Sequence, residues 1–342
     1  MDTFHIKGTT GDSRIYVDER LHNVGKYLPD NKTIIITDEN VKKHYSSGFP
    51  NFPVITISMG ESIKTLATVE SIYRQLIDLD CDRQTFILAL GGGIVCDIAG
   101  FVASTFQRGL KFGFVSTSLL SQVDASVGGK NGVNFDSYKN MVGVFMQPEF
   151  VICDIKMLNS LPKEEIANGF AEIVKHALIE DSSMFEFIEK NKDKALNLDS
   201  EVITQLVTDC IRIKSSVVQK DEKESGERRR LNFGHTIGHA IEKITQPGHG
   251  NAVSLGMVAA ANFSLKKGFI TEPDYKRIVN LLIDLNLPVE HNIDLGEIVK
   301  ALKADKKRDG DFIYFIFLSK IGQSLIERIS FTEIEDYLFS QA

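Results

Sequence analysis

The amino-acid sequence predicts an N-terminal, Rossmann-like α/β domain with a largely parallel sheet, followed by a mostly α-helical C-terminal domain. The first observation is the length, because 342 residues suit two domains of about 150 residues better than one. The second is that short apolar runs alternate with helical patterns over residues 33–154. The third is the change to long amphipathic helices after Asp154. We therefore expect domains over residues 1–157 and 158–342.

Five apolar runs in the N-terminal half have the length of buried strands. They cover residues 33–37, 52–57, 84–90, 111–115 and 150–154. Residues 62–79 repeat apolar side chains with a helical period, and a further helix is expected from Ile94. Strands that alternate with helices in this way pair in parallel, because a crossover separates each strand from the next.

The C-terminal half is expected to begin with a helix near Ser160. Ser160 can cap this helix, and Pro162 falls within its first turn, where a missing N–H is tolerated. Helical patterns continue to about Leu285, and only residues 312–318 and 324–329 have strand character. Because no low-complexity linker separates the halves, we expect a tight hinge near residues 155–160 with a cleft beside it.

The composition is that of an ordinary globular protein. The net charge is −7 and no long basic tract is interleaved with aromatic residues, so no nucleic-acid partner is expected. The longest apolar run, residues 312–318, is far shorter than the ~18 residues of a membrane span, and the start has no apolar signal segment. We expect a cytoplasmic protein without a membrane partner.

Four scattered cysteines, without a C-x-x-C pair, indicate reduced core thiols rather than disulfides or a thiolate metal site. A metal site in this chain must therefore use histidine and carboxylate ligands. Two short basic runs, residues 228–230 and 306–308, are as typical of solvated helix ends as of an anion-binding lining.

Gly91, Gly92 and Gly93 join the third predicted strand to the helix that follows it. Such a turn lets backbone N–H groups approach a phosphate at the positive end of the helix. The dinucleotide fingerprint is incomplete, because Cys96 stands where its third glycine or alanine belongs. Asp38, after the first strand, is the better candidate for a ribose-binding acid. We interpret the turn as phosphate-binding, with a tight structural turn as the alternative.

Residues 116–134 form a polar, glycine-containing segment that Lys139 and Asn140 follow. Asp124 and Lys130 lie within it, and lysines suit a phosphate. The segment is too polar for a core element and too apolar for a free loop. We expect it to surround a polar ligand; a hairpin with surface lysines is the alternative.

Three of the eight histidines, His235, His239 and His249, fall within fifteen positions. His235 and His239 are four apart in a helical run, so both imidazoles leave the same face, as in metal-binding helices. On another predicted helix, Glu172 shares a face with Lys175. A glutamate inside an apolar helix needs a partner, so Glu172 is either the third ligand or a surface partner of Lys175 or His176.

These residues favour an enzyme with a nucleotide-type domain and a His/carboxylate metal site. A metal-dependent oxidoreductase of a polyol or sugar fits them. A phosphatase or nucleotide hydrolase would also use the metal and the lysines, but the sequence has neither a P-loop nor a cluster of aspartates. A pure binding module is the least favoured class, because lysines beside a metal are costly to hold without function.

Six motifs, in order, resemble the 3-dehydroquinate synthase family of sugar-phosphate cyclases from about Asp38 to the C-terminal region. They are Gly60-Glu-Ser-Ile-Lys, residues 91–101, residues 122–134, Lys139-Asn, residues 171–175 and residues 231–240. Their joint occurrence is far more specific than any one of them. The family's fold agrees with the two domains expected above, and the resemblance makes the first the NAD-binding domain and the second the metal- and substrate-binding domain.

The resemblance also implies a set of site residues. It assigns Glu172, His235 and His249 to Zn²⁺, for which Co²⁺ could substitute. For NAD⁺ it implies Asp38, Glu61, Lys64, Gly91, Gly92, Gly93, Asp97, Thr117 and Ser118, with Asp124, Lys130 and Lys139 near the nicotinamide. For the substrate it implies Lys214, Arg228 and Asn232 at a carboxylate, Arg108, Lys130, Asn140 and Lys306 at a phosphate, and His239. The candidate catalytic residues are Asp124, Lys130, Lys175 and His239.

The implied reaction converts 3-deoxy-D-arabino-heptulosonate 7-phosphate to 3-dehydroquinate and phosphate in the shikimate pathway of aromatic amino-acid and chorismate biosynthesis. The implied steps are transient oxidation by NAD⁺, phosphate elimination, reduction and aldol closure. Related sugar-phosphate cyclases, which act on substrates without the carboxylate, are the alternative. Arg228 and Asn232 favour the substrate that carries it. The resemblance further implies a homodimer.

Overall fold

The structure, a computed structural model, describes residues 2–136, 138–303 and 310–340. It divides into two compact units. The first comprises Met1–Pro162 and Ile203–Lys223, and the second comprises Lys163–Val202 and Glu224–Ala342. The predicted fold class is confirmed. Among the described residues, no helix combines the length and the apolar character that crossing a membrane requires.

The first unit holds nine strands and four helices of the described chain. The strands are β1 (Asp2–Gly8), β2 (Gly11–Val17), β3 (Thr33–Asp38), β4 (Val54–Ile57), β5 (Phe86–Gly91), β6 (Phe112–Ser116), β7 (Lys130–Phe135), β8 (Tyr138–Phe145) and β9 (Phe150–Cys153). The helices are α1 (Glu39–Tyr45), α2 (Leu66–Asp78), α3 (Gly93–Thr105) and most of α6 (Ser200–Lys220). The short helices used below are η1 (Leu21–Lys26), η3 (Glu61–Ile63), η4 (Phe106–Arg108), η5 (Ser121–Ala125) and η6 (Ile155–Ser160).

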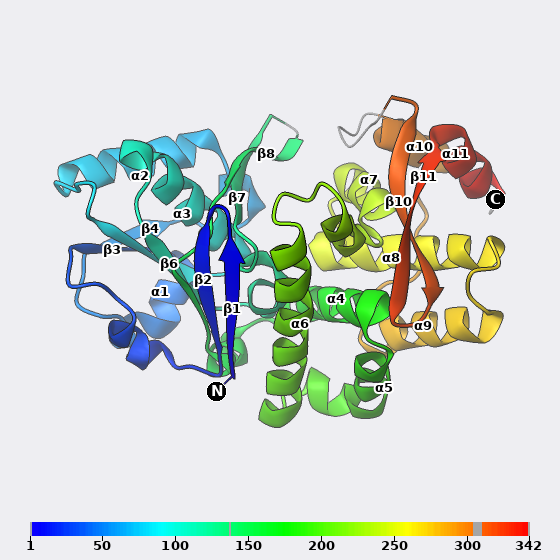
Figure 1. Cartoon of the computed structure of the whole chain (residues 1–342), viewed down its shortest axis with the longest axis horizontal. Coiled ribbons are helices and arrows are strands. Elements are labelled where there is room, and N and C mark those ends of the chain that lie inside the picture. Colours follow the sequence, from blue (N-terminus) through cyan, green and yellow to red (C-terminus); the bar gives the residue numbers. More distant parts are fainter. Residues whose placement is uncertain (1, 137, 304–309, 341–342) are drawn as a thin grey trace. The chain divides into compact units, whose positions relative to one another are not determined.

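Seven of these strands form one sheet in the order β1-β2-β9-β6-β5-β3-β4, which Figure 1 colours from blue to green. All neighbours in this sheet pair in parallel except β1 and β2. The chain runs outward from β3 to β4 and returns with β5 on the other side of β3. The strand order therefore reverses between β3 and β5, and doubly wound sheets bind ligands outside the carboxyl ends of strands at such a point.

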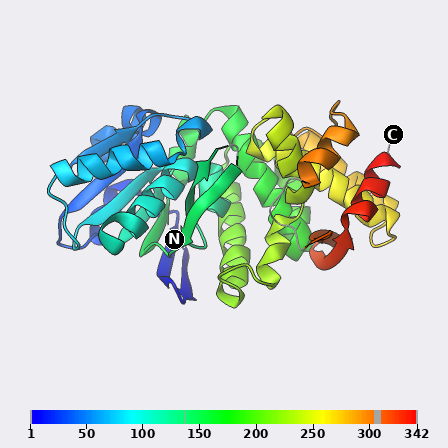
Figure 2. The same ribbon diagram turned by 90° about the horizontal axis from the view of Figure 1, so that it is seen from above.

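The sheet is buried on both faces, as continuous apolar runs in β3, β5 and β9 predict. On one face Ile35, Leu88 and Ile152 pack with Leu21 of η1 and Val41 of α1. Helices α2 and α3 lie side by side over the sheet when it is viewed from above (Figure 2). This two-sided cover fixes the carboxyl ends of β3, β5 and β6, where the polar candidates begin.

The polar segment of residues 116–134 and its continuation do form a hairpin in part. Residues 121–125 make the π-helical turn η5, and β7 and β8 pair antiparallel from Lys130 to Phe145. The hairpin packs on α3, and its base carries Asn131, whose side chain fills the space left by Gly100. A Cβ atom on Gly100 would lie 1.9 Å from Asn131 Oδ1. The hairpin is therefore a fixed part of the first unit.

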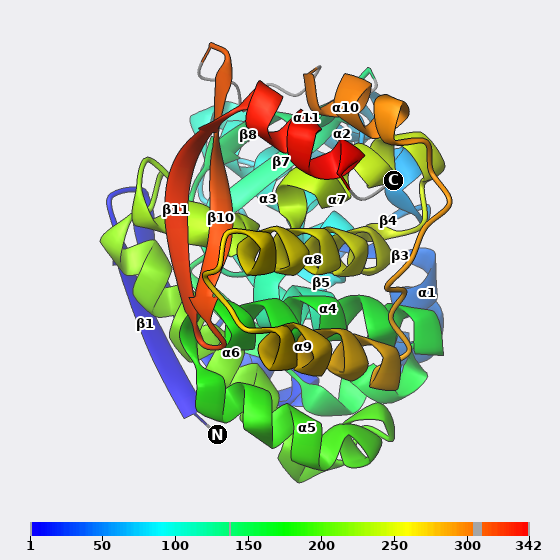
Figure 3. The ribbon, with the colours of Figure 1, turned by 90° about the vertical axis from the view of Figure 1, so that its right-hand side faces the viewer.

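The second unit is mostly helical, with one hairpin. Its helices are α4 (Lys163–Glu180), α5 (Ser182–Leu196), α7 (His235–Thr245), α8 (His249–Lys266), α9 (Glu272–Asp284), α10 (Leu295–Lys303) and α11 (Phe331–Phe339), its short helix is η7 (Glu227–Asn232), and its strands are β10 (Phe312–Lys320) and β11 (Gln323–Ser330). Figure 3 shows α8 with α4 and α9, both of which it contacts, and the β10–β11 hairpin running across the ends of these helices. Helix α8 is thus enclosed by neighbours, which agrees with its largely apolar sequence.

Two predicted helix starts differ from those observed. The helix expected from residue 62 begins at Leu66, because the Thr65 side chain accepts a hydrogen bond from the Thr68 N–H at 3.3 Å and caps it. Ser160 does not start α4. It ends η6, where its hydroxyl donates to the Met157 carbonyl at 3.1 Å and accepts from the Tyr45 hydroxyl at 2.8 Å.

Candidate functional site

Glu172, His235 and His249 converge in the second unit although they come from three helices. Glu172 lies in the middle of α4, His235 is the first residue of α7, and His249 is the first residue of α8. The Glu172 Oε1 atom is 3.0 Å from His249 Nε2 and 3.5 Å from His235 Nε2. One ligand atom from each residue lies within 4.8 Å of the other two. One carboxylate and two imidazoles are a donor set that catalytic zinc sites use.

Backbone contacts bring these three residues together. At the start of α8, a Cβ atom on Gly250 would lie 2.4 Å from the Cα atom of Asn168 on α4. The Gly250 N–H donates to the Asn168 side-chain oxygen at 3.1 Å. Because only a glycine can approach α4 this closely, His249 is held one residue away from that contact and faces Glu172.

The charges around Glu172 keep it ionised inside the protein. Its side chain is fully buried, and its second carboxylate oxygen forms an ion pair with the buried Lys175. Burial by itself raises the pKa of Glu172, but the Lys175 ammonium and the imidazoles of His235 and His249 outweigh it and hold this pKa well below its usual range. Glu172 is therefore a carboxylate at neutral pH, as a metal ligand must be.

His235 is arranged as a neutral ligand. Burial lowers its pKa, although Glu172 opposes that effect. Its Nδ1 atom is 3.1 Å from the Phe233 carbonyl oxygen. A proton on Nδ1 satisfies that carbonyl and leaves the lone pair of Nε2 directed at the Glu172 side, which is how metal-binding histidines are oriented.

The residues present fit a divalent metal ion. The Oε1 atom of the fully buried Glu172 faces two imidazole nitrogens, and its Oε2 atom is held by the ion pair with Lys175. Nitrogen and oxygen donors of this kind accept both Zn²⁺ and Co²⁺. Glu172, His235 and His249 are therefore the residues that could hold such an ion.

His239 lies beside this group without completing it. Its ring centroid is 5.1 Å from that of His235 and 6.4 Å from that of His249. The pairing of His235 and His239 on one helix, which the sequence by itself suggested, gives way to His235 with His249. His239 instead groups with His249 and Glu242, a buried residue that the sequence analysis missed. The signal was present, because Glu242 follows His239 by three positions on α7.

The glycine turn lies at the reversal of strand order in the first unit. β5 ends at Gly91, and α3 starts at Gly93 with no side-chain cap at its N-terminus. A Cβ atom on Gly91 would lie 2.4 Å from the Val95 Cβ atom. The N–H groups of the first turn of α3 are the donors that a phosphate would use. Asp38 ends the neighbouring strand β3, and one of its oxygens accepts from the Val41 N–H at 2.9 Å.

A second polar group gathers around Lys64 next to this turn. The buried Lys64 Nζ atom is 2.5 Å from Asp97 Oδ2 and 2.5 Å from Asn140 Oδ1. Burial raises the pKa of Asp97, while the Lys64 ammonium opposes that rise. Glu61 joins through Asn134, whose amide donates to Glu61 at 2.8 Å. Asn140, expected on the phosphate side of the substrate, thus lies with three of the cofactor candidates.

The remaining candidates of the first unit lie at several places. Lys214 of α6 donates to the Asp124 carboxylate and to its backbone carbonyl, both at 2.6 Å. Thr117 and Ser118 follow β6, and the Thr117 N–H donates to the Gly91 carbonyl at 3.0 Å. The exposed side chains of the set are Arg108 at the end of η4, Lys130 at the start of β7, and Lys139 on β8.

In the second unit, Arg228 and Asn232 both lie on η7. Arg228 is only 1% exposed, which is unusual for an arginine. The Asn232 amide donates to Glu224, a second glutamate that the sequence analysis did not single out. Lys306, expected at the substrate phosphate, lies outside the described residues.

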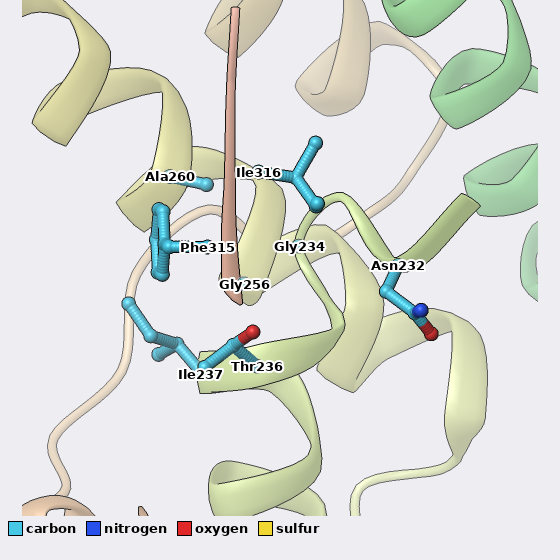
Figure 4. A pocket seen from close by; sticks show the side chains of 8 residues that line it. All are labelled: Asn232, Gly234, Thr236, Ile237, Gly256, Ala260, Phe315 and Ile316. Atoms are coloured by element: carbon cyan, nitrogen blue, oxygen red, sulfur yellow. The ribbon is translucent and has the colours of Figure 1, made fainter. Parts of the chain in front are cut away.

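A small cavity in the second unit separates Asn232 from the β10–β11 hairpin. Figure 4 shows its lining residues, which are Asn232, Gly234, Thr236, Ile237, Gly256, Ala260, Phe315 and Ile316. It has no room for a water molecule. The cavity is therefore a packing gap between α7, α8 and β10 and does not bind a ligand.

Comparisons with known proteins show the family of this chain. Residues 54–168 match the family model for the 3-dehydroquinate synthase N-terminal domain, and residues 169–308 match the model for its C-terminal domain. The chain is 40% identical over 321 residues to the 3-dehydroquinate synthase of Desulforamulus reducens, covering 89% of each chain.

Solved structures of sugar-phosphate cyclases share the fold. A 2-deoxy-scyllo-inosose synthase complexed with carbaglucose-6-phosphate, NAD⁺ and Co²⁺ has a TM-score of 0.87 and 28% identity, covering 98% of this chain and 99% of that one. The 2-epi-5-epi-valiolone synthase of Streptomyces hygroscopicus subsp. jinggangensis 5008, with NAD⁺ and Zn²⁺ bound, has a TM-score of 0.89 and 25% identity, covering 98% and 97%. The chain belongs to the 3-dehydroquinate synthase family and is a phosphate-eliminating cyclase of that family.

Proposed function

We propose that this enzyme converts 3-deoxy-D-arabino-heptulosonate 7-phosphate to 3-dehydroquinate and phosphate, using Zn²⁺ or Co²⁺ and a catalytic NAD⁺ that is regenerated in each turnover. The observation that carries the proposal is the meeting of Glu172, His235 and His249 within 4.8 Å, in a chain of this family. Bound NAD⁺ supplies a reversible hydride acceptor, and the bound metal ion supplies a Lewis acid for neighbouring hydroxyl groups. The residues of the chain bind, orient and exchange protons around that chemistry.

The proposed metal ligands are Glu172, His235 and His249. Glu172 is the one carboxylate among these ligands, and Lys175 keeps it ionised from its other side. His239 lies next to the two histidine ligands, so its imidazole is placed to bind the substrate or to exchange a proton with it. We assign His239 and Lys175 to the catalytic group for these reasons.

The proposed NAD⁺ site is the carboxyl edge of the sheet in the first unit. The N–H groups after Gly91, Gly92 and Gly93 bind the pyrophosphate at the positive end of α3. The proposed neighbours of the cofactor are Asp38, Glu61, Lys64, Asp97, Thr117, Ser118, Asp124, Lys130 and Lys139. Lys64 holds the side chains of Asp97 and Asn140 in place next to the glycine turn.

The proposed substrate contacts are cationic or amide side chains. Arg228, Asn232 and Lys214 bind the carboxylate, and Arg108, Lys130, Asn140 and Lys306 bind the phosphate. A buried arginine suits a carboxylate, since its planar guanidinium can donate two parallel hydrogen bonds. Asp124 and Lys130 complete the proposed catalytic group, and the Lys214 ammonium forms an ion pair with Asp124 at 2.6 Å.

We further propose that the enzyme is a cytoplasmic homodimer that binds neither nucleic acid nor membranes. Four large apolar side chains are exposed on the β7–β8 hairpin, which supports an interface there. They are Phe135, Tyr138, Met141 and Phe145. Analytical ultracentrifugation should give a dimer for the natural chain and a weaker dimer for Met141→Ser; a natural chain that sediments as a monomer contradicts this part of the proposal.

The decisive test of the activity is product stoichiometry. The purified protein is incubated with the heptulosonate phosphate and an amount of NAD⁺ equal to the enzyme. Release of many equivalents of phosphate without accumulating NADH supports the cyclase. Stoichiometric NADH instead supports a metal-dependent polyol dehydrogenase. Turnover only of a substrate that lacks the carboxylate supports a related sugar-phosphate cyclase.

A further inference from the structure

We infer that Glu242 is a positioning residue that orients His249 toward the metal ion, an inference that rests on the metal site proposed above. Glu242 lies on α7, two turns beyond His235, and is only 5% exposed. Its Oε1 atom is 3.8 Å from His249 Nδ1, while the other ring nitrogen of His249 is 3.0 Å from Glu172 Oε1. One imidazole therefore lies between two buried carboxylates, one at each nitrogen.

The chemistry of imidazole gives the two carboxylates different roles. A neutral imidazole carries a proton on one nitrogen and a lone pair on the other. When Nε2 binds a cation next to Glu172, the proton must be on Nδ1, where Glu242 is its acceptor. A distance of 3.8 Å is longer than a hydrogen bond, so we expect it to shorten once Nε2 is bound.

His235 shows the same arrangement with a different acceptor. Its Nδ1 atom faces the Phe233 carbonyl at 3.1 Å, and its Nε2 atom faces Glu172. The acceptor of His235 is fixed by the backbone, whereas His249 is 31% exposed and has to be oriented by a side chain. Glu242 does for His249 what the Phe233 carbonyl does for His235. An acceptor at the far nitrogen fixes the ring and makes the ligand more basic.

The same residues offer a competing explanation, because His239, Glu242 and His249 also lie close enough to bind a cation directly. The two explanations differ in the ligands that contact the metal. If Glu242 is a ligand, replacing it changes the coordination sphere. If Glu242 positions His249, replacing it leaves Glu172, His235 and His249 as the ligands and lowers only their affinity for the metal ion.

The test is Co²⁺ binding by Glu242→Gln and Glu242→Ala, followed by chelator competition and by the visible absorption of the bound ion. Loss of the acceptor should weaken Co²⁺ by about 100-fold in Glu242→Ala and by about 10-fold in Glu242→Gln, which retains a weaker acceptor. The shape of the Co²⁺ absorption band should stay that of the natural protein in both. The exposed neighbour Lys243→Ala is the matched control and should keep the natural affinity.

Two outcomes would overturn the inference while leaving the metal site intact. The first is a Co²⁺ affinity within twofold of the natural protein in both Glu242 variants. The second is a Co²⁺ absorption band whose shape differs from that of the natural protein, which would make Glu242 a ligand. A natural protein that binds no Co²⁺ would instead refute the proposed metal site itself, and with it this inference.

Discussion

The Gly234 carbonyl oxygen would lie 1.9 Å from a Cβ atom on Gly256, so α7 and α8 touch through their backbones. Gly234 caps α7 in the left-handed conformation, with φ of 78°, directly before His235. Gly238, one turn into α7, makes the same kind of contact, 2.7 Å from the Ala252 carbonyl to its would-be Cβ atom. Because glycines stand at these contacts, α7 and α8 approach more closely than side chains would allow. These are the helices that carry His235 and His249.

We predict that Gly256→Ala weakens metal binding without touching a ligand. The new methyl group has to push α8 away from α7, which costs about 1–3 kcal/mol and separates His249 from His235. The thermal midpoint should fall by several degrees, and Co²⁺ should bind about 10-fold more weakly. Gly25→Ala is the matched control, because nothing lies within 4 Å of its Cβ position. A natural Co²⁺ affinity in Gly256→Ala would contradict the prediction.

A second prediction concerns the burial of Lys175 next to Glu172. Glu172→Gln should lose the metal, and it should also lose about 3–5 kcal/mol of stability, because the variant breaks the buried ion pair between Glu172 and the Lys175 ammonium. The double variant Glu172→Gln with Lys175→Met should recover most of that stability and none of the metal. Urea unfolding after removal of metal measures the first effect, and elemental analysis measures the second. Metal retained in full by Glu172→Gln would rule out this ligand set.

A third prediction concerns acid stability and Glu222, which follows α6. Burial raises the pKa of Glu222, but hydrogen bonds from Gln147, Thr10 and Thr9 outweigh it and lower the pKa to about 2. These bonds hold the turn between β1 and β2, where the Thr9 N–H donates to the carboxylate at 2.7 Å. Since the folded pKa lies below the ordinary 4.5, this stability is fully present above about pH 4.5 and is lost as the pH falls toward 2.

Glu222→Gln should therefore lower the unfolding free energy by on the order of 1–2 kcal/mol at pH 7, since the group is partly solvated. The difference between the variant and the natural chain should shrink as the pH falls from 5 to 2. Urea unfolding at four pH values measures it. The exposed Glu201→Gln on α6 is the control, and a pH-independent difference would show that the carboxylate charge is not the cause.

The sequence predicted the parts of the fold in which apolar residues form a clear pattern. The strands that became β3, β5, β6 and β9 are continuous apolar runs, and their parallel pairing follows from the helices between them. The N-terminal hairpin β1–β2 was missed because polar residues interrupt both strands, so neither is a continuous apolar run. The turn between them is fixed by Glu222, a contact more than 200 positions away that no local pattern reveals.

The candidate site also depends on contacts that no local sequence pattern reveals. Spacing of four placed His235 and His239 on one helical face, which is correct, yet the residue that joins His235 and Glu172 is His249 from another helix. That choice depends on how closely α4, α7 and α8 approach, and glycines decide it. The role of Glu242 could not be predicted for the same reason, because only the packing of the helices places its carboxylate at His249.

The last prediction tests the substrate carboxylate against Arg228. Arg228→Ala should lower kcat/KM for the heptulosonate phosphate by about 10- to 100-fold, the effect of losing charge-assisted hydrogen bonds, while NAD⁺ and metal affinities stay natural. A substrate analogue without the carboxylate should lose a similar factor with the natural enzyme and almost nothing further with the variant. Such coupling assigns the interaction to this pair of groups. Arg83→Ala, an exposed arginine of the first unit, is the control. If the analogue and the variant lose activity independently, so that their effects multiply, Arg228 does not bind the carboxylate.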